Sequence, residues 1–316
     1  MAKSAIINKT YYHLRSLIPR RFQIWLRSKV ILRKRRLYSN IWPIDESASK
    51  VPDAWLGWPE QKQFALVLTH DVDTARGQER CYQLAEKEEK LGFRSSFNFV
   101  PERYKVCSEL RDYLTKHGFE VGVHGLNHDG KLFQSRKMFR ERSREINRYL
   151  REWKATGFRS PAMHHNLNWL HALDIEYDAS TFDTDPFEPQ SEGMRTIYPF
   201  WVSRDGNREG YVELPYTLPQ DFTLFVLMKA RNIHIWKRKL DWIAKNGGMA
   251  LLNTHPDYMN SDGKKLKTEE YPAKYYEEFL LHIRTRHKGK FWHVLPKDMA
   301  RFWANKAYAS ERMRHT

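Results

Sequence analysis

Two aspartates that follow an apolar run are the first residues of the chain whose types and spacing suit chemistry. Asp71 and Asp73 come just after residues 64–68, Phe-Ala-Leu-Val-Leu, a run typical of a strand buried on both faces. Alternation along an extended chain points both carboxylates to the same side. Two such carboxylates repel each other unless a cation or a shared proton lies between them. The pair therefore indicates a metal or acid–base site, with a plain polar turn as the alternative.

Two histidines four residues apart, His124 and His128, form a second candidate group. On a helical turn, residues i and i+4 share a face, so both imidazoles can bind one ion. Two imidazoles and one carboxylate make a common ligand set for a divalent metal, with positions left for water and substrate. The alternative is a pair of unrelated surface histidines, because the chain has 14 histidines.

Arg159 and His255 also stand where predicted strands end, because Arg159 closes the strand at 156–159 and His255 follows the strand at 249–253. Barrel enzymes gather their catalytic groups at such ends. Arg159 either orients a carboxylate of the site or makes a structural ion pair. His255 lies in the sequence Asn-Thr-His-Pro-Asp, and this position favours a functional role.

An alternation of strands and helices that begins at residue 64 must position these side chains. We expect strands at 64–68, 95–100, 119–124, 156–159, 177–180, 211–214, 249–253 and 291–294, and helices at 78–91, 108–116, 133–154, 167–173, 232–246, 270–287 and 297–306. Repeated alternation predicts parallel strands in a barrel or a doubly wound sheet. With 316 residues, 41% of them hydrophobic, the chain suits one large α/β domain with appendages.

Four motifs, in this order, resemble those of the polysaccharide deacetylases with the NodB homology domain, carbohydrate esterase family 4. They are Thr69-His70-Asp71-Val72-Asp73, His124-Gly-Leu-Asn-His128, Arg159-Ser160-Pro161 and Leu252-Asn253-Thr254-His255. The resemblance implies a distorted (β/α)7-type barrel and a metal-dependent removal of acetyl groups from sugars. It is closest to a cytoplasmic-type branch associated with surface-polysaccharide biosynthesis.

The resemblance also implies roles for individual residues. Asp71 is the catalytic base, and Asp73, His124 and His128 hold one divalent ion of the zinc or cobalt type. The family's adjacent aspartates are Asp-Val-Asp here, which leaves the reverse assignment of Asp71 and Asp73 open. His255 is the expected acid, Arg159 orients the base, and either Asp183 or Asp185 orients His255.

Two motif positions differ from the family pattern. Ala162 replaces a tyrosine after Arg-x-Pro, and the fourth motif, expected at 178–187, lacks its tryptophan.

The residue types suit amide hydrolysis on their own account. A divalent ion makes water nucleophilic and polarises a carbonyl. A carboxylate can accept the proton of that water, and an imidazole can donate one to the leaving amine. We therefore expect an acetylated sugar as substrate, with N-acetyl favoured over O-acetyl.

A basic N-terminal segment forms a separate unit. Residues 1–40 carry eleven Lys and Arg and no acid, which accounts for most of the net charge of +16. Within residues 10–37, Phe22, Trp25, Leu26 and Leu32 recur at helical spacing, together with the stem of Lys29. Such a helix can pack on the domain or lie on an anionic membrane, and nucleic acid is the least favoured partner.

We divide the chain into an N-terminal extension and tryptophan-rich linker (1–58), a catalytic domain (59–306) and a C-terminal tail (307–316). No apolar stretch suits a membrane span or a secretory signal, and Cys81 and Cys107 fit no disulfide or zinc pattern, so we expect a cytoplasmic protein. Two alternative functions stay open. A nucleotide-sugar glycosyltransferase would use Asp71-Val72-Asp73 for metal and diphosphate, and a catalytically silent barrel would only bind glycans.

Overall fold

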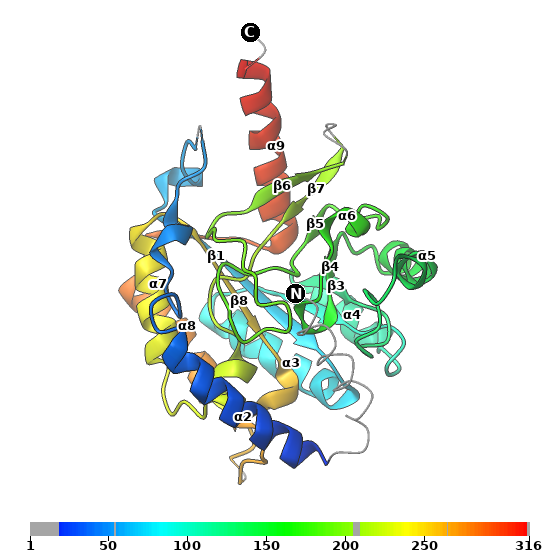
Figure 1. Cartoon of the computed structure of the whole chain (residues 1–316), viewed down its shortest axis with the longest axis vertical. Coiled ribbons are helices and arrows are strands. Elements are labelled where there is room, and N and C mark those ends of the chain that lie inside the picture. Colours follow the sequence, from blue (N-terminus) through cyan, green and yellow to red (C-terminus); the bar gives the residue numbers. More distant parts are fainter. Residues whose placement is uncertain (1–18, 54, 205–208, 264, 315–316) are drawn as a thin grey trace.

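The protein has a curled, mostly parallel sheet covered by helices, as Figure 1 shows for this computed structural model. The structure describes residues 19–53, 55–204, 209–263 and 265–314. The strands of the main sheet are β1 (Phe64–Val72), β2 (Ser96–Phe99), β3 (Glu120–His124), β4 (Gly157–Arg159), β5 (Tyr177–Asp178), β6 (Phe200–Ser203), β7 (Gly210–Glu213), β8 (Met249–Thr254) and β11 (Phe291–His293). A small second sheet pairs β9 (Met259–Asn260) with β10 (Tyr271–Pro272).

Strand β1 is the centre of the fold. All nine of its residues are buried, and it pairs in parallel with β8, β2 and β11. From β2 the sheet continues through β3, β4, β5 and β7 to β6, which is antiparallel to β7. Leu218, shortly after β7, forms an isolated parallel bridge to Leu252 of β8. The sheet therefore curves back toward β8, and the expected distorted barrel is confirmed.

Most helices lie outside the sheet, with α7 and α8 on one side and α4 and α5 on the other in Figure 1. Their bounds are α2 (Arg20–Leu37), α3 (Ala75–Leu91), α4 (Ser108–Lys116), α5 (Arg136–Trp153), α6 (Leu167–Leu170), α7 (His234–Lys245), α8 (Lys274–Arg286) and α9 (Pro296–Arg314). Thr74 caps the start of α3, because its hydroxyl accepts a hydrogen bond from the amide of Gly77, and Gly92 caps the end with a φ of 80°. That positive φ is accessible to glycine at little cost.

Several expected elements differ in extent or kind. Strand β1 continues beyond residue 68 to Val72, and α9 extends past residue 306 to Arg314. Helix α6 and strand β5 are shorter than expected and end at Leu170 and Asp178. The interpretation of His124–His128 as one helical turn is wrong. His124 is the last residue of β3, and His128 lies in the following loop with a φ of 55°.

The tryptophans of the linker anchor it to the barrel. The side chains of Trp42 and Trp58 are buried, and the indole of Trp58 donates to the carbonyl oxygen of Gly247 at 2.7 Å. Trp42 packs edge-on against Phe187, with 5.0 Å between the ring centroids.

Helix α2 packs on the domain through the side opposite to the expected apolar face. Its buried residues are Gln23, Ile24 and Ile31, whereas the side chains of Phe22 and Trp25 are 52% and 53% exposed. Residues 10–18 lie outside the described part of the chain. Among the described helices, none is long and apolar enough to cross a membrane.

Candidate metal and catalytic centre

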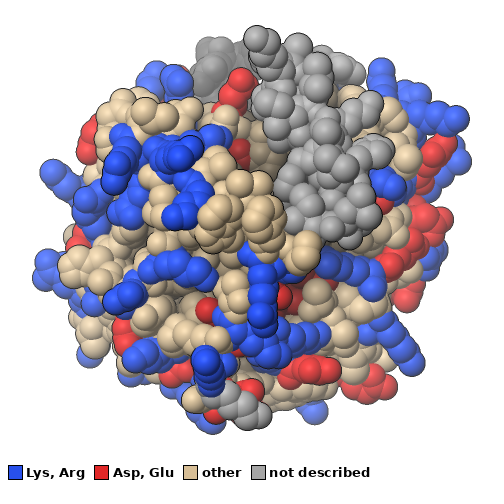
Figure 2. Space-filling model, turned by 60° about the horizontal axis from the view of Figure 1, so that its bottom comes forward, with Lys and Arg blue, Asp and Glu red and all other residues tan. Residues whose placement is uncertain are grey.

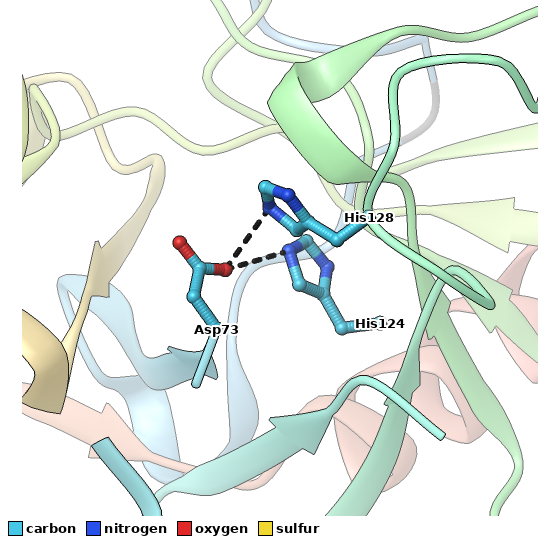
Figure 3. A group of neighbouring side chains, drawn as sticks. All are labelled: Asp73, His124 and His128. Carbon is cyan, nitrogen blue, oxygen red and sulfur yellow. Dashed lines mark ion pairs between the residues drawn. The ribbon is translucent and has the colours of Figure 1, made fainter. Parts of the chain in front are cut away.

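Asp73, His124 and His128 converge where β1 and β3 end (Figure 3). One carboxylate oxygen, Oδ1 of Asp73, lies 3.4 Å from Nε2 of His124 and 3.1 Å from Nε2 of His128. The three ligand atoms all lie within 4.8 Å of one another. Strand register explains the arrangement, because β1, β2 and β3 are parallel neighbours whose carboxyl ends lie at one edge.

The surroundings of this triad suit a divalent ion. Oδ1 of Asp73 is buried and has no hydrogen-bond partner among the described residues. Nδ1 of His124 donates to the carbonyl oxygen of Arg159 at 3.0 Å, which leaves the lone pair of Nε2 directed toward Asp73. Burial opposes ionisation of Asp73, but His128 and His124 outweigh it and hold the pKa of this carboxyl well below its usual range. The donor set of two nitrogens and one carboxylate matches zinc-type ions.

Asp71 lies beside the triad but has different partners. Nδ2 of Asn98 donates to its Oδ1 at 3.0 Å, and Nδ2 of Asn253 donates to its Oδ2 at 2.8 Å. Its Oδ2 is 3.9 Å from Nε2 of His124, farther than the oxygen of Asp73. The two amides fix the carboxylate in place, so Asp71 is better suited to accept a proton than to bind the ion.

Arg159 supports the ionised state of Asp71 by charge. Its Nε lies 3.6 Å from Oδ1 of Asp71, and its guanidinium is fully buried without a hydrogen-bond partner in the described parts of the chain. Burial raises the pKa of Asp71, but His124, Arg159 and His255 together lower it below its ordinary value. Asp71 is therefore ionised at neutral pH.

His255 lies near both Asp71 and Asp73 and is held by Asp221. Its Nδ1 and its backbone amide donate to the two carboxylate oxygens of Asp221 at 2.7 and 2.8 Å. The hydroxyl of Tyr271 donates to the same carboxylate at 2.9 Å. Burial opposes protonation, but Asp221, Asp73 and Asp71 raise the pKa of His255 to about 10. The imidazole of His255 is therefore protonated on both nitrogens, and positively charged, at neutral pH.

The prediction that Asp183 or Asp185 orients His255 is wrong. Asp183 accepts a hydrogen bond from the ammonium group of Lys239 at 2.5 Å, and Asp185 accepts one from the hydroxyl of Tyr216 at 2.8 Å. Both aspartates are buried in these structural contacts, and Asp221 takes the place expected for them.

Sequence reasoning missed Asn98, Asn253 and Asp221. Asn253 belongs to the Leu252–His255 motif and lies in a strand that pairs with β1, so its position next to Asp71 was accessible from strand pairing. Asn98 is the register partner of Asp71 on β2. Asp221 gives no such signal, because it precedes a short π-helix (Phe222–Leu227) and follows no predicted strand.

A pocket of about 490 Å³ adjoins the centre. Its lining includes Asp73, His128 and Tyr258 of the barrel, together with Arg20 and Gln23 of α2. The N-terminal extension thus forms part of the pocket wall.

Comparison with known proteins relates the chain to others through its structure alone. No protein-family model matches the sequence, and no curated protein does. A Mycobacterium smegmatis structure classed as a polysaccharide deacetylase has a TM-score of 0.63 at 17% identity, covering 80% of this chain and 94% of that one. A Pseudomonas aeruginosa structure of the same class has a TM-score of 0.58 at 15% identity, covering 78% and 93%.

The allantoinase PuuE is also similar, with a TM-score of 0.61 at 14% identity, covering 83% of this chain and 97% of that one. One fold thus serves more than one substrate class, and the substrate must be argued from the site. The resemblance seen in the four motifs is confirmed at the level of the fold: this chain has the NodB-like barrel of the polysaccharide deacetylases.

Proposed function

We propose that the protein is a metal-dependent hydrolase that removes an acetyl group from the nitrogen of a sugar. One observation carries the proposal: Asp73, His124 and His128 converge at a pocket edge, with Asp71 beside them and His255, held by Asp221, near both aspartates. Hydrolysis of an amide needs these functions together, namely an activated water, a base and an acid.

Asp73, His124 and His128 would hold the ion. A bound zinc-type ion lowers the pKa of water and withdraws electrons from a carbonyl oxygen. Mg²⁺ and Ca²⁺ prefer shells of oxygen ligands, so two imidazole nitrogens favour Zn²⁺ or Co²⁺.

The other residues divide the proton transfers between them. Asp71, kept ionised by Arg159 and oriented by Asn98 and Asn253, accepts the proton of the attacking water. His255 donates its Nε2 proton to the leaving nitrogen while Asp221 keeps the ring in place through Nδ1. An amine leaves poorly unless it is protonated, so this acid matters most for an amide.

The substrate we propose is an acetylated saccharide intermediate of surface-polysaccharide biosynthesis, processed in the cytoplasm. The neighbours classed as polysaccharide deacetylases support the saccharide, and two free thiols, Cys81 and Cys107, suit a reducing compartment. The glycosyltransferase alternative gives no role to the two histidines or to the pair of His255 and Asp221. A catalytically silent barrel would not need Asp71 to be oriented by two side-chain amides and kept ionised by the guanidinium of Arg159.

Acetate release tests the proposal. The metal-free protein would be incubated with N-acetylglucosamine oligosaccharides, with N-acetylglucosamine 1-phosphate and with allantoin, before and after addition of one equivalent of Zn²⁺ or Co²⁺. We expect acetate from at least one sugar only after the metal is added, and none from a His128→Ala variant. Turnover of allantoin alone, or acetate release that is insensitive to the metal, would contradict the proposal. A UDP-sugar that tightens metal binding would favour the glycosyltransferase.

A further inference from the structure

Helix α2 carries an exposed apolar surface of unusual size for this protein. Among the residues that the structure describes, eleven large hydrophobic side chains are exposed, and six belong to this one helix: Phe22, Trp25, Leu26, Val30, Leu32 and Leu37. The rings of Phe22 and Trp25 stack with centroids 5.4 Å apart. An apolar patch of this kind on a soluble surface marks an interaction site.

Cations surround this apolar surface. The sequence of α2 contains eight Lys and Arg and no acid. Lys29 and Arg33 are exposed, and the ammonium group of Lys29 lies 5.9 Å from the ring of Trp25. Helical spacing puts Phe22, Lys29 and Arg33 on one side of the helix, away from the buried Ile24 and Ile31. Helix α2 runs along the lower part of the view in Figure 1. Figure 2 brings this lower side forward and shows that it is rich in Lys and Arg.

The helix is fixed to the site. Nε of Arg20 pairs with Glu269 at 3.1 Å, and the guanidinium of Arg27 lies 5.2 Å from the ring centroid of Phe222. Phe222 directly follows Asp221, the partner of His255, and packs on Tyr258 at the pocket. Any partner that binds the outer face of α2 therefore lies next to the pocket.

Arginines also line that pocket. Arg76 and Arg103 contribute to its wall together with Arg20. Arg20 pairs with Glu269 and Arg76 pairs with Glu270, whereas Arg103 is exposed. The exposed guanidinium of Arg103 at the wall of a carbohydrate site suits a phosphate on the substrate.

From these relationships we propose that α2 lies in the interface of an anionic phospholipid bilayer, and that the substrate is an acetylated saccharide joined through phosphate to a lipid in that bilayer. The second half of the inference rests on the proposed hydrolase function. Stacked aromatic and aliphatic side chains enter the headgroup region while the flanking cations pair with anionic lipids. The same positive charge disfavours a second copy of this chain as the occupant, because two such faces repel each other.

Vesicle binding tests the docking without any need for activity. The full-length protein would be sedimented with vesicles of phosphatidylcholine alone and with vesicles that contain phosphatidylglycerol. We expect binding to the anionic vesicles only, and a loss of at least about tenfold in the Phe22→Ser/Trp25→Ser variant. A Val51→Ser/Leu56→Ser variant, which changes two apolar side chains exposed in the linker, is the matched control and should bind like the wild type. His124→Ala should bind equally well, because docking does not use the metal.

Equal sedimentation of the Phe22→Ser/Trp25→Ser variant and the wild type, or equal binding to both kinds of vesicle, would overturn the docking. A soluble dimer that this variant dissociates would overturn it in favour of a second copy.

The substrate is tested with two probes that share one headgroup: N-acetylglucosamine 1-phosphate in solution and its long-chain alkyl ester held in anionic vesicles. We expect acetate release from the vesicle-held probe to exceed that from the soluble probe, and the Phe22→Ser/Trp25→Ser variant to lose only this advantage. Equal rates on both probes would contradict a lipid-linked substrate. If neither probe nor any other sugar releases acetate, the hydrolase function fails, whereas the vesicle experiment still decides the docking.

Discussion

His255 and Asp221 form a buried pair in which Nδ1 of the imidazole donates to the carboxylate at 2.7 Å. The backbone amide of His255 donates to the second oxygen of the same carboxylate. The two contacts fix the orientation of the ring, which leaves Nε2 to act on a substrate.

The first prediction concerns the pH dependence that this pair imposes. Burial opposes protonation, but Asp221, Asp73 and Asp71 raise the folded-state pKa of His255 from an ordinary value of 6.5 to about 10. The contribution of this proton to folding stability is therefore complete below about pH 6.5 and is lost as the pH rises from there through the folded pKa, and the acid itself is lost as the pH rises through the folded pKa. An Asp221→Asn variant removes the main partner charge, so the alkaline limb of its rate profile on an amide should move to lower pH.

Asp183→Asn is the matched control for this experiment, because Asp183 contacts Lys239 instead of His255. The rate profile of the folded Asp183→Asn protein should keep its alkaline limb at the same pH as that of the wild type. If the Asp183 variant moved the limb and the Asp221 variant did not, the earlier assignment of Asp183 would have to be restored.

Asp71 and Asp73 should have separable roles. We expect Asp71→Asn to keep its metal and to lose roughly 10²–10⁴-fold in turnover, because the amide cannot accept a proton. Asp73→Asn should lose the metal, since it changes the oxygen that lies closest to both imidazoles. Elemental analysis beside acetate release measures both. Retention of metal in Asp73→Asn with loss in Asp71→Asn would exchange the two roles.

His255 should matter more for amides than for activated esters. A His255→Ala variant removes the proton that the leaving nitrogen needs, whereas a nitrophenolate leaves without one. We expect a much larger fall in rate for an N-acetyl sugar than for 4-nitrophenyl acetate. An equal fall for both substrates would mean that His255 acts at a step common to both, and not on the leaving group.

The buried ion pair of Asp183 and Lys239 should be structural. Lys239 also donates to the carbonyl oxygen of Pro43 and so ties α7 to the N-terminal extension. A Lys239→Met variant leaves Asp183 buried without its cation, and such losses destabilise proteins by about 3–5 kcal/mol. Urea denaturation should show this change, while the turnover of folded protein stays near that of the wild type. A loss of turnover without a loss of stability would place the pair in the mechanism.

The sequence predicted the residues at strand ends because parallel strands fix where their carboxyl ends lie. Asp71, Asp73, His124 and His255 all follow this rule, and the alternation that sets Asp71 and Asp73 on one side of β1 is present in the structure. The spacing of His124 and His128 suggested a helical turn, and that prediction was wrong. The same spacing brings two imidazoles together when a strand ends at the first histidine and the second has a positive φ.

Contacts made by loops and by helix faces could not be predicted from the sequence. Asp221 reaches His255 from an irregular segment, and no periodicity of the chain signals that approach. The period of α2 correctly grouped Phe22, Trp25 and Leu26, but it could not decide whether that group faced the barrel or the solvent. The segment Phe222–Leu227, which α2 packs against, is far from α2 in the sequence, so only the tertiary fold decides this.

The anomalous scattering of crystals grown with Zn²⁺ tests the metal centre most directly. We predict one strong peak bonded to Oδ1 of Asp73 and to the Nε2 atoms of His124 and His128, with Asp71 outside bonding distance. The described residues include a second group of this type, Asp241, His282 and His287, on α7 and around the end of α8. A peak at that second group with none at Asp73, or a peak bonded to Asp71 in place of Asp73, would contradict the account.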